Sequence, residues 1–106
     1  IYDPMTKIEE FEQHVAKHAS YNLDDTYCVI ALNGEAGEVA EWFKKMVLRG
    51  NPTGKLTEDD LKGELGDVLY YLTRLANNHN WSLSDVMEAN IKKLDERVAK
   101  KMRMIS

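Results

Sequence analysis

Two short segments of this sequence carry the residues best suited to chemistry, and they share one pattern. Residues 34–39 read GEAGEV and residues 63–68 read GELGDV, so each segment sets two carboxylates three positions apart. Residues i and i+3 are neighbours on the face of a helix. Two such faces brought together would surround one point with the carboxylates of Glu35, Glu38, Glu64 and Asp67. Acidic groups this close repel one another unless a cation lies between them, so the pattern predicts a metal site.

The position of these acids within otherwise apolar stripes supports that prediction. Glu35 falls between Leu32 and Val39, where a core residue is expected, and Glu64 lies beside Leu61. Burying an unpaired carboxylate costs several kcal/mol, so a compensating charge is needed. The alternative is that each acid belongs to an ordinary solvated face and is paired with a nearby lysine. The repetition of the whole pattern favours the metal site.

An all-oxygen ligand set indicates a hard cation, Mg²⁺, with Mn²⁺ as a substitute, over zinc or copper. A di-iron helical bundle would need Glu-x-x-His pairs. None of the histidines, His14, His18 and His79, follows a glutamate at that spacing. Mg²⁺ usually keeps several waters and binds carboxylates together with substrate phosphates, so we expect a polyphosphate ligand.

A cationic partner for phosphates is available near the end of the chain. Asn90, Lys93 and Arg97 fall at i, i+3 and i+7, on one face of a predicted helix. Lysine and arginine are common phosphate ligands. A solvated basic helix end would give the same spacing, but together with the acidic site a phosphate clamp is the better interpretation.

The repeated segments also contain four glycines inside predicted helices, at positions 34, 37, 63 and 66. Glycine in a helix interior costs roughly 0.5–1 kcal/mol relative to alanine. We therefore expect these glycines to allow two helices to approach closely enough for their carboxylates to share an ion.

The elements that must position these residues are all helical. Apolar periodicity, cap residues and the breaker at residues 50–54 predict helices over residues 6–18, from Asp24 or Asp25 to about 49, from Thr57 to about 76, and from Ser82 onward. The fold class is thus an all-α bundle with one short N-terminal helix and three longer ones. The last helix carries a heptad-like apolar stripe: Leu83, Met87, Ile91, Leu94, Val98 and Met102. In a chain this small the stripe favours burial against a second copy, and we expect a homodimer or homotetramer.

Size and composition set the outer limits. With 106 residues, 43% of them apolar, we expect one globular domain over residues 1–106. The net charge of -4 argues against a general nucleic-acid binder. Apolar runs are too short for a membrane span. The lone Cys28 is expected to be a buried apolar residue, and together these features favour a soluble, reducing, cytoplasmic setting.

The motifs resemble those of the MazG family of all-α nucleoside triphosphate pyrophosphohydrolases. That family's signature is E-x-x-E, a spacer, E-x-x-D, and then N-x-x-K-x-x-x-R. Here the three parts are residues 35–38 (EAGE), 64–67 (ELGD) and 90–97 (NIKKLDER). The resemblance extends over residues 24–98 or so, while the first helix matches only in general character.

The resemblance implies hydrolysis between the α- and β-phosphates of a nucleoside triphosphate, giving the monophosphate and pyrophosphate. It assigns Glu35, Glu38, Glu64 and Asp67 as Mg²⁺ ligands, with Lys93 and Arg97 on the phosphates and Asn90 beside them. It also implies an oligomer that removes unwanted nucleotides. A carboxylate not fully engaged by metal would accept the proton of the attacking water. We assign that role to Glu35, because its apolar surroundings should raise its pKa, with Glu38 as the second catalytic carboxylate.

The sequence says less about the residues that recognise the base than about those that bind metal and phosphate. Tyr71 lies one turn beyond Asp67 and could pack on the sugar or base, and Trp42, one turn beyond Glu38, is a second candidate, although both positions also suit core residues. Two other functions stay open: a phosphoribosyl-ATP pyrophosphohydrolase-like enzyme, and a non-catalytic helical module that binds a nucleotide or a protein.

Overall fold

The computed structural model describes residues 5–19 and 21–105, and within them every regular element is helical. The α-helices are α1 (Lys7–His18), α2 (Asp25–Phe43), α3 (Glu58–Asn78) and α4 (Leu83–Ile105). A π-helical segment, η1 (Lys44–Leu48), continues α2. The predicted all-α fold class is confirmed.

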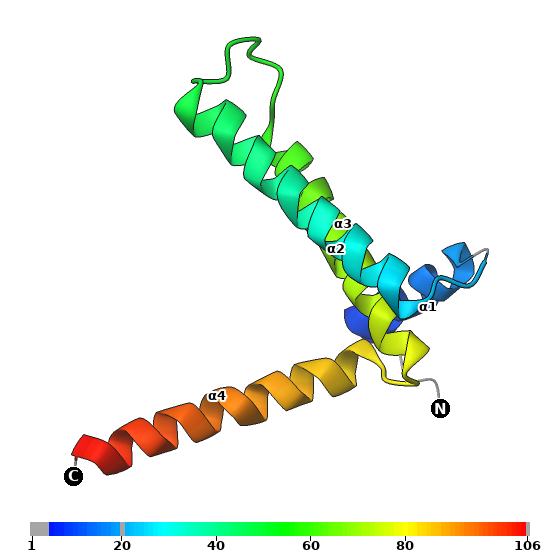
Figure 1. Cartoon of the computed structure of the whole chain (residues 1–106), viewed down its shortest axis with the longest axis vertical. Coiled ribbons are helices and arrows are strands. Elements are labelled where there is room, and N and C mark those ends of the chain that lie inside the picture. The colour runs from blue at the N-terminus through cyan, green and yellow to red at the C-terminus, as the bar shows by residue number, and fades with distance from the viewer. Residues whose placement is uncertain (1–4, 20, 106) are drawn as a thin grey trace.

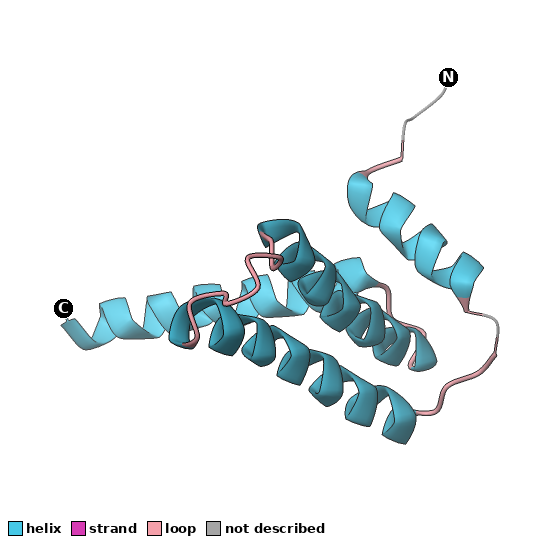
Figure 2. Ribbon diagram, turned by 90° about the horizontal axis from the view of Figure 1, so that it is seen from above, coloured by secondary structure: helices cyan, strands magenta, loops and turns pink. Residues whose placement is uncertain are grey.

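The arrangement is a helical hairpin with two arms attached at one end. α2 and α3 lie antiparallel and side by side along their length, and the loop after η1 joins them at the far end (Figure 1). α1 packs against the C-terminal part of α3, and α4 leaves from the same end, so the hairpin and α4 form the arms of a V (Figures 1 and 2).

Each helix begins where a polar side chain satisfies its free N–H groups. Thr6 accepts from the Glu9 N–H at 3.2 Å, and Asp24 accepts from the Tyr27 N–H at 2.8 Å. Thr57 and Asp60 form a complete capping box for α3. Ser82 is capped reciprocally by the side chain of Asp85, 2.8 Å from its N–H, at the start of α4. The predicted helix starts are therefore confirmed.

The second helix departs from the prediction near its C-terminus. We expected one α-helix to about Arg49, but α geometry ends at Phe43 and residues 44–48 wind as a π-helix, with the Arg49 N–H donating to the Lys44 carbonyl at 3.1 Å. The chain then turns through Gly50 and Gly54, both at φ +67, where a side chain would be strained. Hydrophobic periodicity does not distinguish the two helix types here, because a π-segment of five residues is too short to show its own period.

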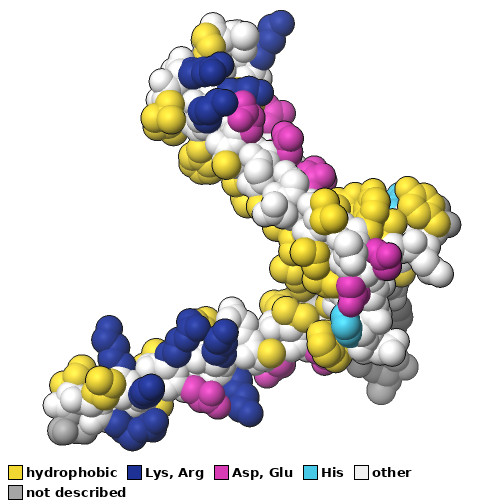
Figure 3. Space-filling view, viewed as in Figure 1, with side chains coloured by type: hydrophobic (Ala, Val, Ile, Leu, Met, Phe, Trp, Pro, Cys, Tyr) yellow, Lys and Arg dark blue, Asp and Glu magenta, His cyan; other side chains and the backbone are white. Residues whose placement is uncertain are grey.

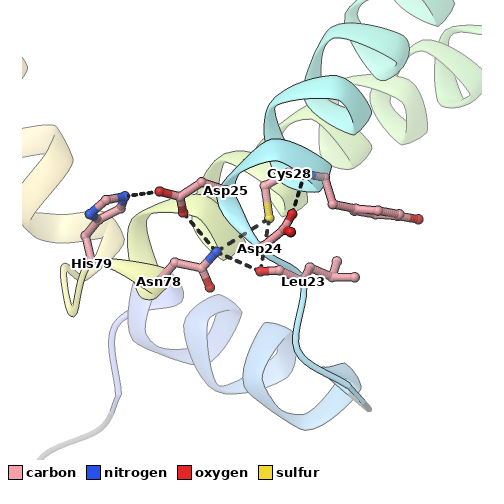
Figure 4. A network of polar contacts seen from close by, with 7 residues as sticks. Leu23, Asp24, Asp25, Cys28, Asn78 and His79 are labelled. Atoms are coloured by element: carbon pink, nitrogen blue, oxygen red, sulfur yellow. Dashed lines mark hydrogen bonds and ion pairs between the residues drawn. The ribbon is translucent and has the colours of Figure 1, made fainter.

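A polar network fixes the open end of the hairpin. The Asn78 amide donates to the Leu23 carbonyl at 2.7 Å and to the Asp25 carboxylate at 3.1 Å, and His79 Nε2 lies 2.8 Å from the other Asp25 oxygen (Figure 4). Cys28 is fully buried beside this network, as the sequence predicted, and burial raises the pKa of its thiol. These contacts lock the start of α2 to the end of α3, and so fix the register of the hairpin.

Arg74 secures the segment that leads into α2. Its side chain is 8% exposed, donates to the Tyr21 carbonyl at 2.8 Å and to the Tyr70 hydroxyl at 2.9 Å, and so ties this segment to α3. A buried guanidinium group needs hydrogen-bond partners for its charge, and these two contacts supply them. Arg74 therefore holds the segment before α2 in place.

Beyond Leu83, the apolar stripe of α4 is left uncovered by the part of the chain that the structure describes. Leu83 is buried and its N–H donates to the Glu12 carboxylate of α1, but all residues from 87 to 105 are exposed. Met87 is 40% exposed and Val98 is 62% exposed. The start of α4 is thus anchored while its length projects free of the hairpin.

Candidate functional site

The hairpin brings three of the four predicted metal ligands to one point. Glu35 of α2 and Glu64 and Asp67 of α3 each offer a carboxylate oxygen, and these oxygens all lie within 4.8 Å of one another. The antiparallel packing of α2 on α3 accounts for this, since it sets the two repeated segments opposite each other. Glu35 and Glu64 are half-buried and Asp67 is exposed, so the cluster opens to solvent on one side.

Glu38, the fourth predicted ligand, stands apart from that group. Its side chain is exposed and, with Glu64, lines a cleft of about 280 Å³ on the same side of the hairpin. It is one helical turn from Glu35, so it borders the cluster without being part of the tight group.

Burial and neighbouring like charges together act on Glu35. The pKa of Glu35 is raised, first by burial and then by the neighbouring carboxylates of Asp67, Glu64 and Glu38. Desolvation and repulsion both disfavour the charged form of an acid. The direction agrees with the expectation from the apolar surroundings of Glu35.

The donor set fits a hard divalent cation. Three carboxylates converge with oxygen ligands alone, which suits Mg²⁺ or Mn²⁺ and leaves room for waters and substrate oxygens. A bound cation would also offset the burial and the repulsion that raise the pKa of Glu35. No His or Cys takes part in this group, which argues against zinc.

Tyr71 lies near the cluster, as its spacing from Asp67 predicted. Its ring is 6.4 Å from that of Tyr27 on α2, and both burial and the charges of neighbours, Glu35 among them, raise its pKa. Trp42, the second candidate for stacking, is 8% exposed and donates its indole N–H to the Thr57 carbonyl at 3.0 Å. Trp42 is therefore a core residue whose hydrogen bond holds the hairpin loop.

The predicted phosphate clamp is not beside the carboxylates within one chain. Asn90, Lys93 and Arg97 lie on the exposed part of α4, which packs against α1 and α3 but makes no contact with α2. Figure 3 shows Lys and Arg along this arm, and Asp and Glu along a flank of the hairpin.

The expectation about the glycines was wrong. A Cβ built at any of the four helical glycines, Gly34, Gly37, Gly63 or Gly66, meets no atom within 4 Å, so none is needed for close approach of the two helices. The carboxylates meet because their long side chains extend across a helix interface of ordinary separation. The spacing of the motif does not show how far these side chains extend.

Two further residues border the site that motif spacing did not single out. Lys45 lines the same cleft as Glu38 and Glu64, and Tyr27 faces Tyr71 at the other end of the hairpin. The signal was present for Lys45, which follows Glu38 by seven residues, or about two turns, on the same face.

Comparison with known proteins agrees with this geometry. Residues 26–102 match the model of the MazG nucleotide pyrophosphohydrolase domain. The chain is 44% identical over 75 residues to the Gene 37 protein of Mycobacterium phage L5, an alignment covering 68% of this chain and 64% of that protein's length. No solved structure gave a significant match. Among the described residues, no helix is both long and apolar enough to cross a membrane. With most of its length matched by the domain model, the chain belongs to the MazG nucleotide pyrophosphohydrolase family.

Proposed function

We propose that the protein hydrolyses (deoxy)nucleoside triphosphates to the monophosphate and pyrophosphate in a Mg²⁺-dependent reaction, as part of the removal of unwanted nucleotides. The observation that carries this proposal is the convergence of Glu35, Glu64 and Asp67 within 4.8 Å in a chain of the MazG family. Carboxylates arranged in this way have little use in a purely structural bundle, because they destabilise it.

In this proposal Glu35, Glu64 and Asp67 hold the cation, with Glu38 at the edge of the group. When bound, the cation supplies charge neutralisation for the phosphates and a site for an ordered water. Glu35 accepts the proton of the attacking water through a carboxylate oxygen that is not engaged by the cation. Glu38 faces the cleft and orients the attacking water. Tyr71 packs on the sugar or base.

The same proposal places Lys93, Arg97 and Asn90 on substrate phosphates through a second copy. α4 of one chain is anchored away from its own carboxylates, and its stripe from Met87 to Met102 is exposed. A homodimer or homotetramer would cover this stripe and bring one chain's α4 toward the other's hairpin. Size-exclusion chromatography with light scattering should give a dimer or tetramer. If the protein is strictly monomeric, α4 does not contribute residues to the site.

The function is tested by a substrate screen. Purified protein is incubated with standard and damaged ribo- and deoxyribonucleoside triphosphates and with phosphoribosyl-ATP, with Mg²⁺ or with EDTA, and products are separated by ion-exchange chromatography. Monophosphate and pyrophosphate in equal amounts, formed only with metal, are expected. Release of single phosphates would refute the cleavage site. No product from any nucleotide would favour the non-catalytic binding module.

A further inference from the structure

The face of the hairpin that carries the carboxylates changes in chemistry along its length. On α2 and η1, Tyr27, Glu38 and Lys45 are separated by 11 and seven residues, close to whole helical turns, and so share one face. On α3, which runs the other way, Tyr71 meets Tyr27 at one end. The order along the hairpin is therefore aromatic, acidic and then basic.

The basic end belongs to the same cleft as the acids. Lys45 lines it with four carboxylates, those of Glu38, Glu41, Asp60 and Glu64, and is the sole cation among the residues that do so. Lys45 also lines an adjoining cavity of about 340 Å³ with Arg49 and Lys55. A helical rise of about 1.5 Å per residue puts the backbone of Lys45 about 10 Å beyond that of Glu38. That distance is comparable with the reach of a lysine side chain and a phosphate or two.

The charge of Lys45 is only weakly engaged by the protein itself. Lys44 takes the Glu41 carboxylate at 3.2 Å, whereas Lys45 lies 4.0 Å from the same oxygen. Its side chain is 53% exposed, so its ammonium group can turn toward the cleft at little cost. Lys44, its neighbour in the chain, does not line the cleft.

We propose that Lys45 binds the phosphates released as pyrophosphate, so that the substrate's polyphosphate points toward η1 and its base toward Tyr27 and Tyr71. The inference rests on the proposed function and adds to it the orientation of the bound nucleotide along the hairpin. The α-phosphate then lies at the carboxylate cluster, where cleavage occurs, and the β- and γ-phosphates lie at the basic end. The nucleoside lies at the tyrosine end, where rings are available for stacking.

Binding of inorganic pyrophosphate in Mg²⁺ buffer tests this directly, because the probe has no base. Isothermal titration calorimetry would compare the wild type with Lys45→Gln and with the matched control Lys44→Gln. Losing a charge-assisted phosphate contact should raise the Kd of Lys45→Gln about tenfold to hundredfold. Lys44→Gln should stay within about twofold of the wild type. Both residues are exposed, so neither variant should unfold.

The steady-state constants supply a second readout. Lys45→Gln should raise the KM for a hydrolysed triphosphate, while its affinity for the matching monophosphate, which lacks the β- and γ-phosphates, stays unchanged. Tyr71→Ala should weaken the monophosphate and leave pyrophosphate binding intact. Equal behaviour of the two lysine variants in an active enzyme would overturn the orientation and leave the proposed function standing. If the wild-type protein hydrolyses no nucleotide and binds no pyrophosphate, both the proposed orientation and the proposed function are refuted.

Discussion

Replacing Glu35 by glutamine should stabilise the metal-free protein, although glutamate is the residue proposed to do the chemistry. Glu35 is half-buried and faces two other carboxylates whose oxygens lie within 4.8 Å. Glutamine keeps the shape of the side chain and removes the charge. The repulsion therefore disappears without a cavity, and the free energy of unfolding rises.

The size of the effect follows from Coulomb's law. Two unit charges 4.8 Å apart repel by about 0.9 kcal/mol in bulk water and by about 3.5 kcal/mol at an effective dielectric constant near 20. Asp67 is exposed, so its repulsion of Glu35 lies at the lower end of this range of energies. A net gain of about 1–3 kcal/mol is expected, which corresponds to a rise in Tm of roughly 5–15 °C for a chain of this size.

The pH dependence has a definite sign. The pKa of Glu35 in the folded protein is raised above 4.5, so the folded state binds this proton more tightly than the unfolded state does. The stability of the metal-free wild type therefore falls as pH rises through the raised pKa. The advantage of Glu35→Gln should be largest at neutral pH and should disappear once pH falls below the unfolded-state pKa of 4.5, where the glutamate is protonated in both the folded and the unfolded state.

Thermal unfolding followed by circular dichroism at one protein concentration measures these differences. In EDTA at pH 7.5, Glu35→Gln should melt above the wild type. With Mg²⁺ at about 100 times its Kd, the wild type should gain about 2.7 kcal/mol and the variant much less. Glu41→Gln, on the same helix but paired with Lys44 at 3.2 Å, is the control and should change stability by no more than about 1 kcal/mol. A metal-free Glu35→Gln protein no more stable than the wild type would refute the reasoning.

Three further substitutions have defined outcomes. Glu38→Gln should lower the metal-dependent kcat by at least about 100-fold. The helical circular dichroism signal should stay unchanged, because Glu38 is exposed in the cleft. Retained turnover would show that Glu38 is not catalytic. Gly34→Ala should raise the free energy of unfolding by about 0.5–1 kcal/mol in urea titrations, since its Cβ enters open space; destabilisation would mean that an unseen neighbour needs the glycine. Arg74→Met should cost about 1–3 kcal/mol, because the Tyr21 carbonyl and Tyr70 hydroxyl lose their donor, and an unchanged urea midpoint would show that these contacts contribute nothing.

Local chemistry made much of the fold predictable. The starts of the helices follow from single side chains, such as Asp24 and Thr57, that satisfy backbone N–H groups within three residues, and such short-range bonds are legible in a sequence. The meeting of the acids was also predictable, since the two motif copies stand on either side of the breaker at residues 50–54 and an antiparallel hairpin sets them near each other.

The remainder depended on side chains that act over longer distances. Whether Glu38 joins Glu35 in the tight group depends on the rotation of α2 against α3, which apolar spacing defines only coarsely. The separation of Lys93 and Arg97 from the carboxylates follows from the loop before α4, where Asn77 donates to the Trp81 carbonyl at 3.0 Å. No periodic pattern encodes the direction in which a helix leaves such a loop.

The π-helical turn at residues 44–48 has a consequence for how this stretch tolerates changes in length. Exposed helix ends usually accept insertions and deletions, because little packs against them. In a π-turn each backbone bond spans one residue more than in an α-helix, so deleting one residue would let the segment wind as α. The residues after the deletion would then keep their places, because the π-turn holds the extra residue within a single turn. This surface segment should therefore tolerate the loss of one residue, which would restore α geometry.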